Sequence, residues 1–106
     1  MLKRTLKLTK EDKDWAKAVK DRDSWLCVVC FSDIRPNAHH IIPREILELK
    51  YDIMIGITLC PKHHFFSRDI SAHNNPLGFF MWMEEYRPNQ LTYCKRRMKE
   101  ILDVRD

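Results

Sequence analysis

The chain has 106 residues, which suffices for one domain but not for a second domain with its own core. Hydrophobic residues make up 44% and charged residues 32%, a balance that excludes a disordered tail protein. No apolar run reaches the roughly 18 residues that cross a membrane, and the basic N-terminus lacks the apolar segment of a secretory signal. We therefore expect one domain, 1–106, that is cytoplasmic and has no membrane partner.

The charge of the chain favours a polyanionic partner. The formal net charge is +4 and the sequence pI is about 9.0, and cations placed on phosphates release condensed counterions. The cations gather in 1–24, a basic N-terminal segment, and again near the C-terminus. The alternative interpretation is a solvated Lys-rich surface. If the partner is a nucleic acid, the expected backbone contacts come from Lys13, Lys17, Lys20, Arg96 and Arg97.

The first predicted element is a helix from Thr9 to Arg22. Thr9 followed by Asp12 resembles an N-terminal capping pattern. Trp15 and Val19 recur at helical spacing, so they predict a narrow buried face.

The middle of the chain predicts two strands and a helix. Ala38–Ile42 and Ile53–Leu59 are short β-prone runs, and Pro43 between them opens a stretch that suits a turn of helix. Pro61 suits the first turn of a further helix that runs through Phe66. The predicted order is therefore strand, strand, helix.

Two more helices are predicted after a polar break at 71–76. They run from Leu77 to Tyr86 and from Leu91 to Val104, and Pro88 separates them. Four apolar residues of these helices are predicted to lie in the core: Phe79, Phe80, Met83 and Ile101.

Cysteine and histidine spacing predicts a structural metal. Four cysteines in a chain without a secretory signal argue against disulfides, because reducing compartments keep thiols reduced. Cys27 and Cys30 form a Cys-x-x-Cys pair, whereas Cys60 and His63 form a Cys-x-x-His pair. Two such pairs supply the four ligands of tetrahedral zinc, so we predict a closed structural Zn²⁺ site. The alternative is that these are buried thiols and a surface histidine. Cys94 has no partner at metal spacing and is interpreted as a helix-packing thiol.

Two adjacent histidine pairs, His39-His40 and His63-His64, flank the predicted strands. Neighbouring residues of a strand point to opposite faces, so His39 and His40 cannot both serve one centre in a regular strand. Neighbouring residues of a helix differ by about 100° in direction, so His63 and His64 can serve two different metals. The spacing from Cys60 assigns His63 to the zinc.

The combination of these motifs resembles the HNH, or ββα-metal, endonuclease family, in its zinc-containing phage or mobile-element type. The resemblance covers about half of the chain. Its matching segments are Cys27-x-x-Cys30, Ala38-His39-His40-Ile41-Ile42-Pro43 and Gly56-Ile57-Thr58-Leu59-Cys60-Pro61-Lys62-His63-His64. The fold it implies is α+β, with a small ββα-metal core of two short antiparallel strands and a helix at 25–76. A structural zinc staples this core, and flanking helices occupy 1–24 and 77–106.

The resemblance implies a DNA endonuclease that hydrolyses phosphodiester bonds, by nicking or by double-strand cleavage. His39 and His64 would hold one catalytic divalent metal, His40 would be the general base, and His63 would replace the usual fourth cysteine of the zinc site. The metal would be Mg²⁺ or Mn²⁺, or a softer Ni²⁺ or Zn²⁺. Cutting both strands would need a homodimer or two encounters. A phage-encoded chain would act inside the host cell.

The sequence departs from the family pattern at two further positions. Ile55 stands where the family has an asparagine, and Arg68 stands where a further histidine often lies. Arg68 is a candidate for holding the scissile phosphate, and His73 is the candidate replacement ligand. Asp52 and Asp69 are further candidates to reach the metal or orient His40.

These departures motivate an alternative function, a catalytically inactive zinc-stapled DNA-binding module. A zinc-stabilised protein-interaction domain is a third possibility, but it leaves the histidine pairs unexplained.

Overall fold

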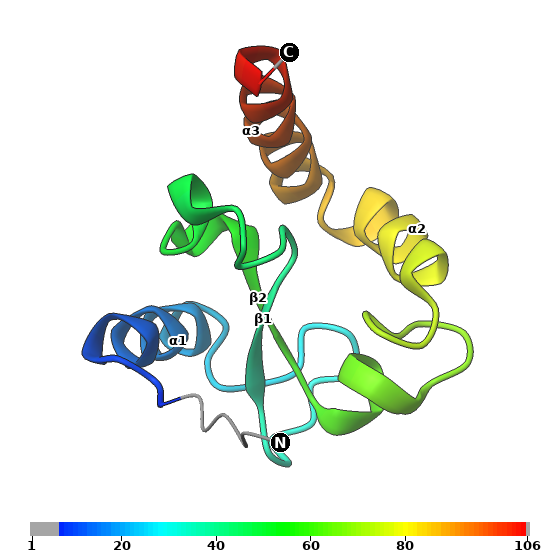
Figure 1. Ribbon diagram of the computed structural model, residues 1–106. Helices are drawn as coiled ribbons and strands as arrows, with labels where there is room; N and C mark the ends of the chain where they lie inside the picture. Colours follow the sequence, from blue (N-terminus) through cyan, green and yellow to red (C-terminus); the bar gives the residue numbers. More distant parts are fainter. Residues whose placement is uncertain (1–6, 106) are drawn as a thin grey trace, which may run out of the picture.

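The computed structural model describes residues 7–105, so residues 1–6 of the predicted basic N-terminal segment lie outside the described residues. The fold is α+β, as predicted. An antiparallel hairpin of β1 (Asn37–His40) and β2 (Gly56–Leu59) lies between helix α1 (Lys10–Arg22) and two further helices (Figure 1). No helix within 7–105 is long and apolar enough to cross a membrane.

Helix α1 begins where the capping pattern predicts. The Thr9 hydroxyl accepts a hydrogen bond from the Asp12 backbone N–H, while the Asp12 carboxylate accepts one from the Thr9 N–H. Trp15 and Val19 form its buried face. A Cβ added to Gly56 would lie 2.5 Å from the Trp15 ring, so the glycine allows α1 to lie directly against β2.

The two strands are shorter than predicted. Pairing begins at Asn37 opposite Leu59 and ends at His40 opposite Gly56. Residues 53–55 form a 3₁₀ turn instead of a strand, because the Asp52 carboxylate caps the turn by accepting the Met54 N–H. Another 3₁₀ turn, Leu47–Leu49, lies in the connection between the strands.

The predicted helix after β2 is a single wide turn, Lys62–Phe66, in which the Ser67 N–H bonds to the Lys62 carbonyl five residues earlier. Helix α2 spans Pro76–Tyr86 and α3 spans Pro88–Arg105, so Pro88 separates them as predicted.

The core has one part on each side of the hairpin. Ile57 and Leu59 face α2, where Phe79 and Met83 are buried as predicted. The prediction for Phe80 was wrong, because its side chain is 39% exposed, and Ile101 is only half-buried. On the opposite side the core comprises Trp15, Val19, Ile42, Leu49, Ile55 and Cys94.

Candidate metal centres

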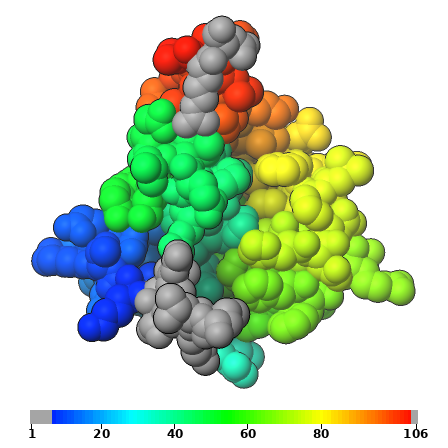
Figure 2. Space-filling model, viewed as in Figure 1, coloured from blue at the N-terminus to red at the C-terminus, as the bar shows by residue number. Residues whose placement is uncertain are grey.

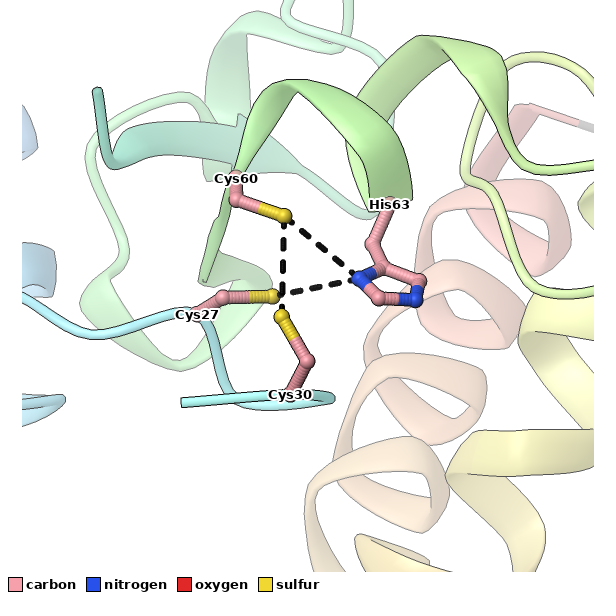
Figure 3. Close-up of side chains that lie close together, drawn as sticks. All are labelled: Cys27, Cys30, Cys60 and His63. Carbon is pink, nitrogen blue, oxygen red and sulfur yellow. Dashed lines mark hydrogen bonds between the residues drawn. The ribbon is translucent and has the colours of Figure 1, made fainter. Parts of the chain in front are cut away.

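Three cysteines and one histidine converge from three parts of the chain (Figure 3). Cys27 and Cys30 lie in the turn after α1, which closes through bonds from the Phe31 N–H to the Cys27 carbonyl and from the Cys27 N–H to the Ser32 carbonyl. Cys60 follows β2 directly, and His63 lies in the wide turn. The four predicted residues are thus brought together around one point.

The spacing of these atoms suits tetrahedral zinc. The His63 Nδ1 lies 3.7 Å from the Cys27 Sγ and 3.5 Å from the Cys60 Sγ, and the Cys30 and Cys60 sulfurs are 3.7 Å apart. Zinc bonds of about 2.3 Å to sulfur and 2.0 Å to nitrogen give edges of about 3.8 Å between sulfurs and about 3.5 Å between sulfur and nitrogen. This Cys₃His cluster could therefore hold a metal ion such as zinc.

The burial of the Cys₃His cluster also suits a bound cation. Burial raises the pKa of the Cys27 thiol to about 11. A metal ion supplies the positive charge that makes the buried thiolate favourable, so ion binding and proton release are coupled. Because all four ligands come from the protein, the cluster has no position for a substrate.

His39, His64 and His73 form a second cluster, in which one ring nitrogen of each lies within 4.8 Å of the others. The His39 Nδ1 and His64 Nε2 are 3.2 Å apart, close to the edge of about 3.3 Å that metal–nitrogen bonds of about 2.0 Å give. Each histidine comes from a different segment: β1, the wide turn and the loop before α2. This histidine cluster has the donor set of a site for a divalent transition metal.

Backbone pairing brings His73 to the histidine cluster. The Ala72 N–H bonds to the His63 carbonyl and the His73 N–H bonds to the His64 carbonyl, each at 3.0 Å. The His73 ring also stacks on Phe65, with centroids 5.0 Å apart. The chain from 67 to 75 therefore folds back along the wide turn and returns a third imidazole to it.

Two imidazoles of this cluster, those of His39 and His64, are held in the neutral form that binds metals. Burial, with smaller contributions from His64, His73 and His40, lowers the pKa of His39 to about 3. Burial and then His73 lower the pKa of His64 to about 4. The His64 Nδ1 is buried without a hydrogen-bond partner, whereas metal-bound histidines usually donate that second N–H to an acceptor.

His40 points to the other side of β1 and is fixed by two contacts. Its ring stacks on Trp15 at a centroid distance of 3.8 Å, and its Nε2 lies 3.0 Å from the Lys50 carbonyl. A carbonyl only accepts, so Nε2 carries the proton and Nδ1 keeps its lone pair in the neutral ring. Burial lowers the pKa of His40, although the Lys50 bond opposes this and Arg44 adds to it, so the neutral ring is favoured.

His40 and the histidine cluster line one hollow of about 500 Å³. Both His39 and His40 line this hollow although they are neighbours in a strand, and β1 ends at His40. Arg44, which sequence reasoning missed, contributes the one Lys or Arg side chain among the described residues that line it. The sequence feature that could have indicated Arg44 is its position directly after the Ala38–Pro43 motif. We call this cavity the histidine hollow.

All of the predicted phosphate contacts lie outside the histidine hollow. Lys17 pairs with Asp21, Lys20 lies over the Trp25 ring, and Arg97 pairs with Glu100. Three remaining candidates that do not line the hollow are Lys13, Arg68 and Arg96. Their roles remain predictions about a wider nucleic-acid surface.

Two acids predicted as further candidates lie elsewhere. The Asp52 carboxylate accepts hydrogen bonds from the Tyr93 hydroxyl and the Met54 N–H. Neither Asp52 nor Asp69 belongs to a metal-ligand cluster within the described residues. The Lys50 carbonyl, instead of a carboxylate, orients His40.

Comparison with known proteins identifies no relative: no family model matches the chain, and neither a curated protein nor a solved structure is significantly similar to it. The chemistry of the two clusters therefore follows from their residues alone.

Proposed function

We propose that this protein is a metal-dependent DNA endonuclease of the HNH, or ββα-metal, type. In this assignment β1, β2 and the wide turn Lys62–Phe66 form the ββα-metal core, and the Cys₃His cluster holds its structural zinc. The observation that carries the proposal is the convergence of His40 and the histidine cluster on one hollow. A general base and a metal site that line one cavity are what in-line hydrolysis of a phosphodiester requires.

His40 acts as the general base. Its Nδ1 accepts a proton from a water molecule, and the water oxygen attacks phosphorus as the bond to the 3′ oxygen breaks. The products are a 5′ phosphate and a 3′ hydroxyl, the latter protonated from solvent. The Trp15 stack and the Lys50 carbonyl hold the imidazole in the required tautomer and orientation.

His39, His64 and His73 hold the catalytic divalent ion. When bound, the ion supplies positive charge to the phosphate oxygens and to the leaving oxygen. Three neutral nitrogen ligands suit Mn²⁺, Ni²⁺ or Zn²⁺ better than Mg²⁺, which prefers oxygen. All three histidines line the histidine hollow, so a phosphate that enters it would meet the bound ion.

Arg44 is suited to bind the phosphate backbone beside the cleavage point. Its side chain is exposed at the histidine hollow and forms no ion pair with a described residue. A guanidinium can donate two parallel hydrogen bonds to phosphate. Cations elsewhere on the surface, on α1 and α3, would extend the contact along DNA.

The second candidate function is a zinc-stapled DNA-binding module without catalysis, and two observations favour it. Ile55 is fully buried and cannot hydrogen-bond through its side chain. The His64 Nδ1 lacks an acceptor. Against it, the Ile55 backbone carbonyl accepts a 2.7 Å hydrogen bond from the Ile41 N–H. This bond ties the segment after β1 to the start of β2 without an asparagine.

Conversion of supercoiled plasmid to nicked and linear forms tests the proposal, with Mg²⁺, Mn²⁺, Ni²⁺ or Zn²⁺ added in turn. The expected result is metal-dependent nicking that falls about 10²- to 10⁴-fold in the His40→Ala variant, while DNA binding is retained. Absence of nicking with every metal, from folded zinc-loaded protein that binds DNA, would favour the binding module.

A further inference from the structure

A second cavity, of about 380 Å³, opens beside the histidine hollow. Its walls are mainly apolar and come from Ile41 and Pro43 after β1, Phe80 of α2, and Leu91 and Met98 of α3. We call it the apolar groove. Figure 2 shows the yellow surface of α2 bordering the green surface of the segment that follows β1.

The apolar groove and the histidine hollow adjoin each other, because Ile41, Pro43 and Phe80 line both. Phe80 therefore forms the ridge between them. A ligand that enters the histidine hollow with one group can place an adjoining group in the apolar groove.

Phe80 is partly exposed to solvent at this ridge. Its side chain is 39% exposed, while the neighbouring Phe79 and Met83 are only 2% and 0% exposed. Exposed apolar surface next to a polar site is typical of ligand contact. A ring in this position is suited to stacking on a flat partner.

The rim of the groove carries one charge of each sign. Glu84 of α2 and Lys95 of α3 line it and are exposed. Neither forms an ion pair within residues 7–105. A carboxylate can accept from an exocyclic amino group, and an ammonium can donate to a base carbonyl or a phosphate.

We propose that the apolar groove binds one unpaired nucleobase, next to the phosphate that lies in the histidine hollow. The base stacks on Phe80, while Glu84 and Lys95 face its polar edge. The nucleic-acid partner of this inference rests on the proposed function. Nucleobases are flat and largely apolar on their faces, and stacking on aromatic side chains recognises every base.

The size of the groove suits a single base. A cavity of about 380 Å³ lies near the lower end of the roughly 300 to 1,000 Å³ usual for small ligands. One base can enter it, but a base pair held in a duplex cannot without leaving its stack. The preferred substrate is therefore single-stranded DNA, or a strand with an unpaired base at the cleavage point.

Fluorescence anisotropy with a labelled 20-nucleotide strand, free or annealed to its complement, tests the proposal. All proteins carry His40→Ala, so that no strand is cut, and no chelator is added. The single strand should bind at least about tenfold more tightly than the duplex. Phe80→Ala should weaken single-strand binding about 5- to 100-fold and duplex binding less than about twofold.

Two further variants keep this test interpretable. Met81→Ala is the matched control, because Met81 is exposed on the same helix and lines neither cavity. It should leave both affinities unchanged. Phe80→Leu keeps an apolar side chain without the aromatic face, so it should bind single strands as weakly as Phe80→Ala.

Equal affinity for the two DNA forms, or equal weakening of both by Phe80→Ala, would overturn the base site. The result is independent of cleavage. A protein that nicks plasmid but shows no Phe80-dependent preference is a nuclease without a base site. A protein that shows the preference but, with His40 restored, cuts neither plasmid nor the labelled single strand has the base site without the proposed catalysis.

Discussion

The two metal-ligand clusters differ in how many coordination positions of a bound ion the protein could fill. The Cys₃His cluster supplies four ligands, three of which are buried. The histidine cluster supplies three ligands, of which His73 is exposed, and it borders a hollow of about 500 Å³. A filled tetrahedral shell stabilises a fold, whereas an incomplete shell at a cavity leaves a position for substrate. Similar side chains are therefore suited to two tasks because their surroundings differ.

The contrast is sharpest at His63 and His64, which are neighbours in one wide turn. The His63 ring joins the three cysteines and the His64 ring joins His39 and His73. Both rings are 7% exposed, so burial alone does not distinguish them. The two rings differ in the direction in which they leave the turn, which brings each to a different cluster.

Removal of a cysteine ligand is expected to have the largest effect. Cys60→Ser should abolish stoichiometric zinc binding and cooperative thermal unfolding, because metal binding free energy contributes directly to folding in small domains. Zinc content and circular dichroism against temperature measure this. Cys94→Ser is the matched control, since Cys94 is buried but lies outside both clusters. Retention of zinc and a normal transition by Cys60→Ser would refute the structural role.

Changes at His73 should alter the catalytic metal and leave the fold intact. His73→Ala should weaken binding of the second metal at least about tenfold, by analogy with perturbed metal sites. His73→Asp should shift the preference toward Mg²⁺, because it introduces an oxygen ligand. Calorimetric titration of zinc-loaded protein with Mn²⁺ and Mg²⁺ reports both. Unchanged affinities in the two variants would remove His73 from the site.

Gly56→Ala should have the smallest of these effects. The added methyl group meets Trp15 and Val19 at 2.5 and 2.6 Å, which should cost about 1–3 kcal/mol of unfolding free energy. Trp15 also stacks on His40, so the nicking rate should fall while both metals stay bound. Urea unfolding and plasmid nicking measure the two effects. If the variant nicks more slowly and also loses metal, the slower nicking would be due to the metal sites and not to His40.

Local sequence patterns predicted those helix boundaries that residues next to them in the sequence determine. The Thr9 and Asp12 cap fixed the start of α1, and Pro88 separated the last helices as expected. The β-prone side chains of residues 53–55 predicted a strand. In the structure these residues form a 3₁₀ helix, which the Asp52 side chain caps. Side-chain caps of this kind compete with strand pairing.

Sequence spacing could not determine contacts made by distant segments. Cys27, Cys30, Cys60 and His63 could be grouped because zinc ligands occur as short paired motifs. His73 joins its cluster through backbone bonds to the wide turn, which no spacing reveals. Phe80 was predicted to lie in the core as an apolar residue of the predicted helix 77–86. Only the two adjoining cavities explain its exposure.

The most direct test of the account is to compare His63→Cys with His64→Ala in one experiment, measuring zinc per chain and plasmid nicking. His63→Cys should keep the structural zinc, because cysteine completes a four-cysteine site, and should keep nicking near the starting rate. His64→Ala should keep the zinc and lose nicking. Nicking by His64→Ala at the starting rate, or its loss in a folded, zinc-loaded His63→Cys protein, would contradict the division of tasks between these neighbours.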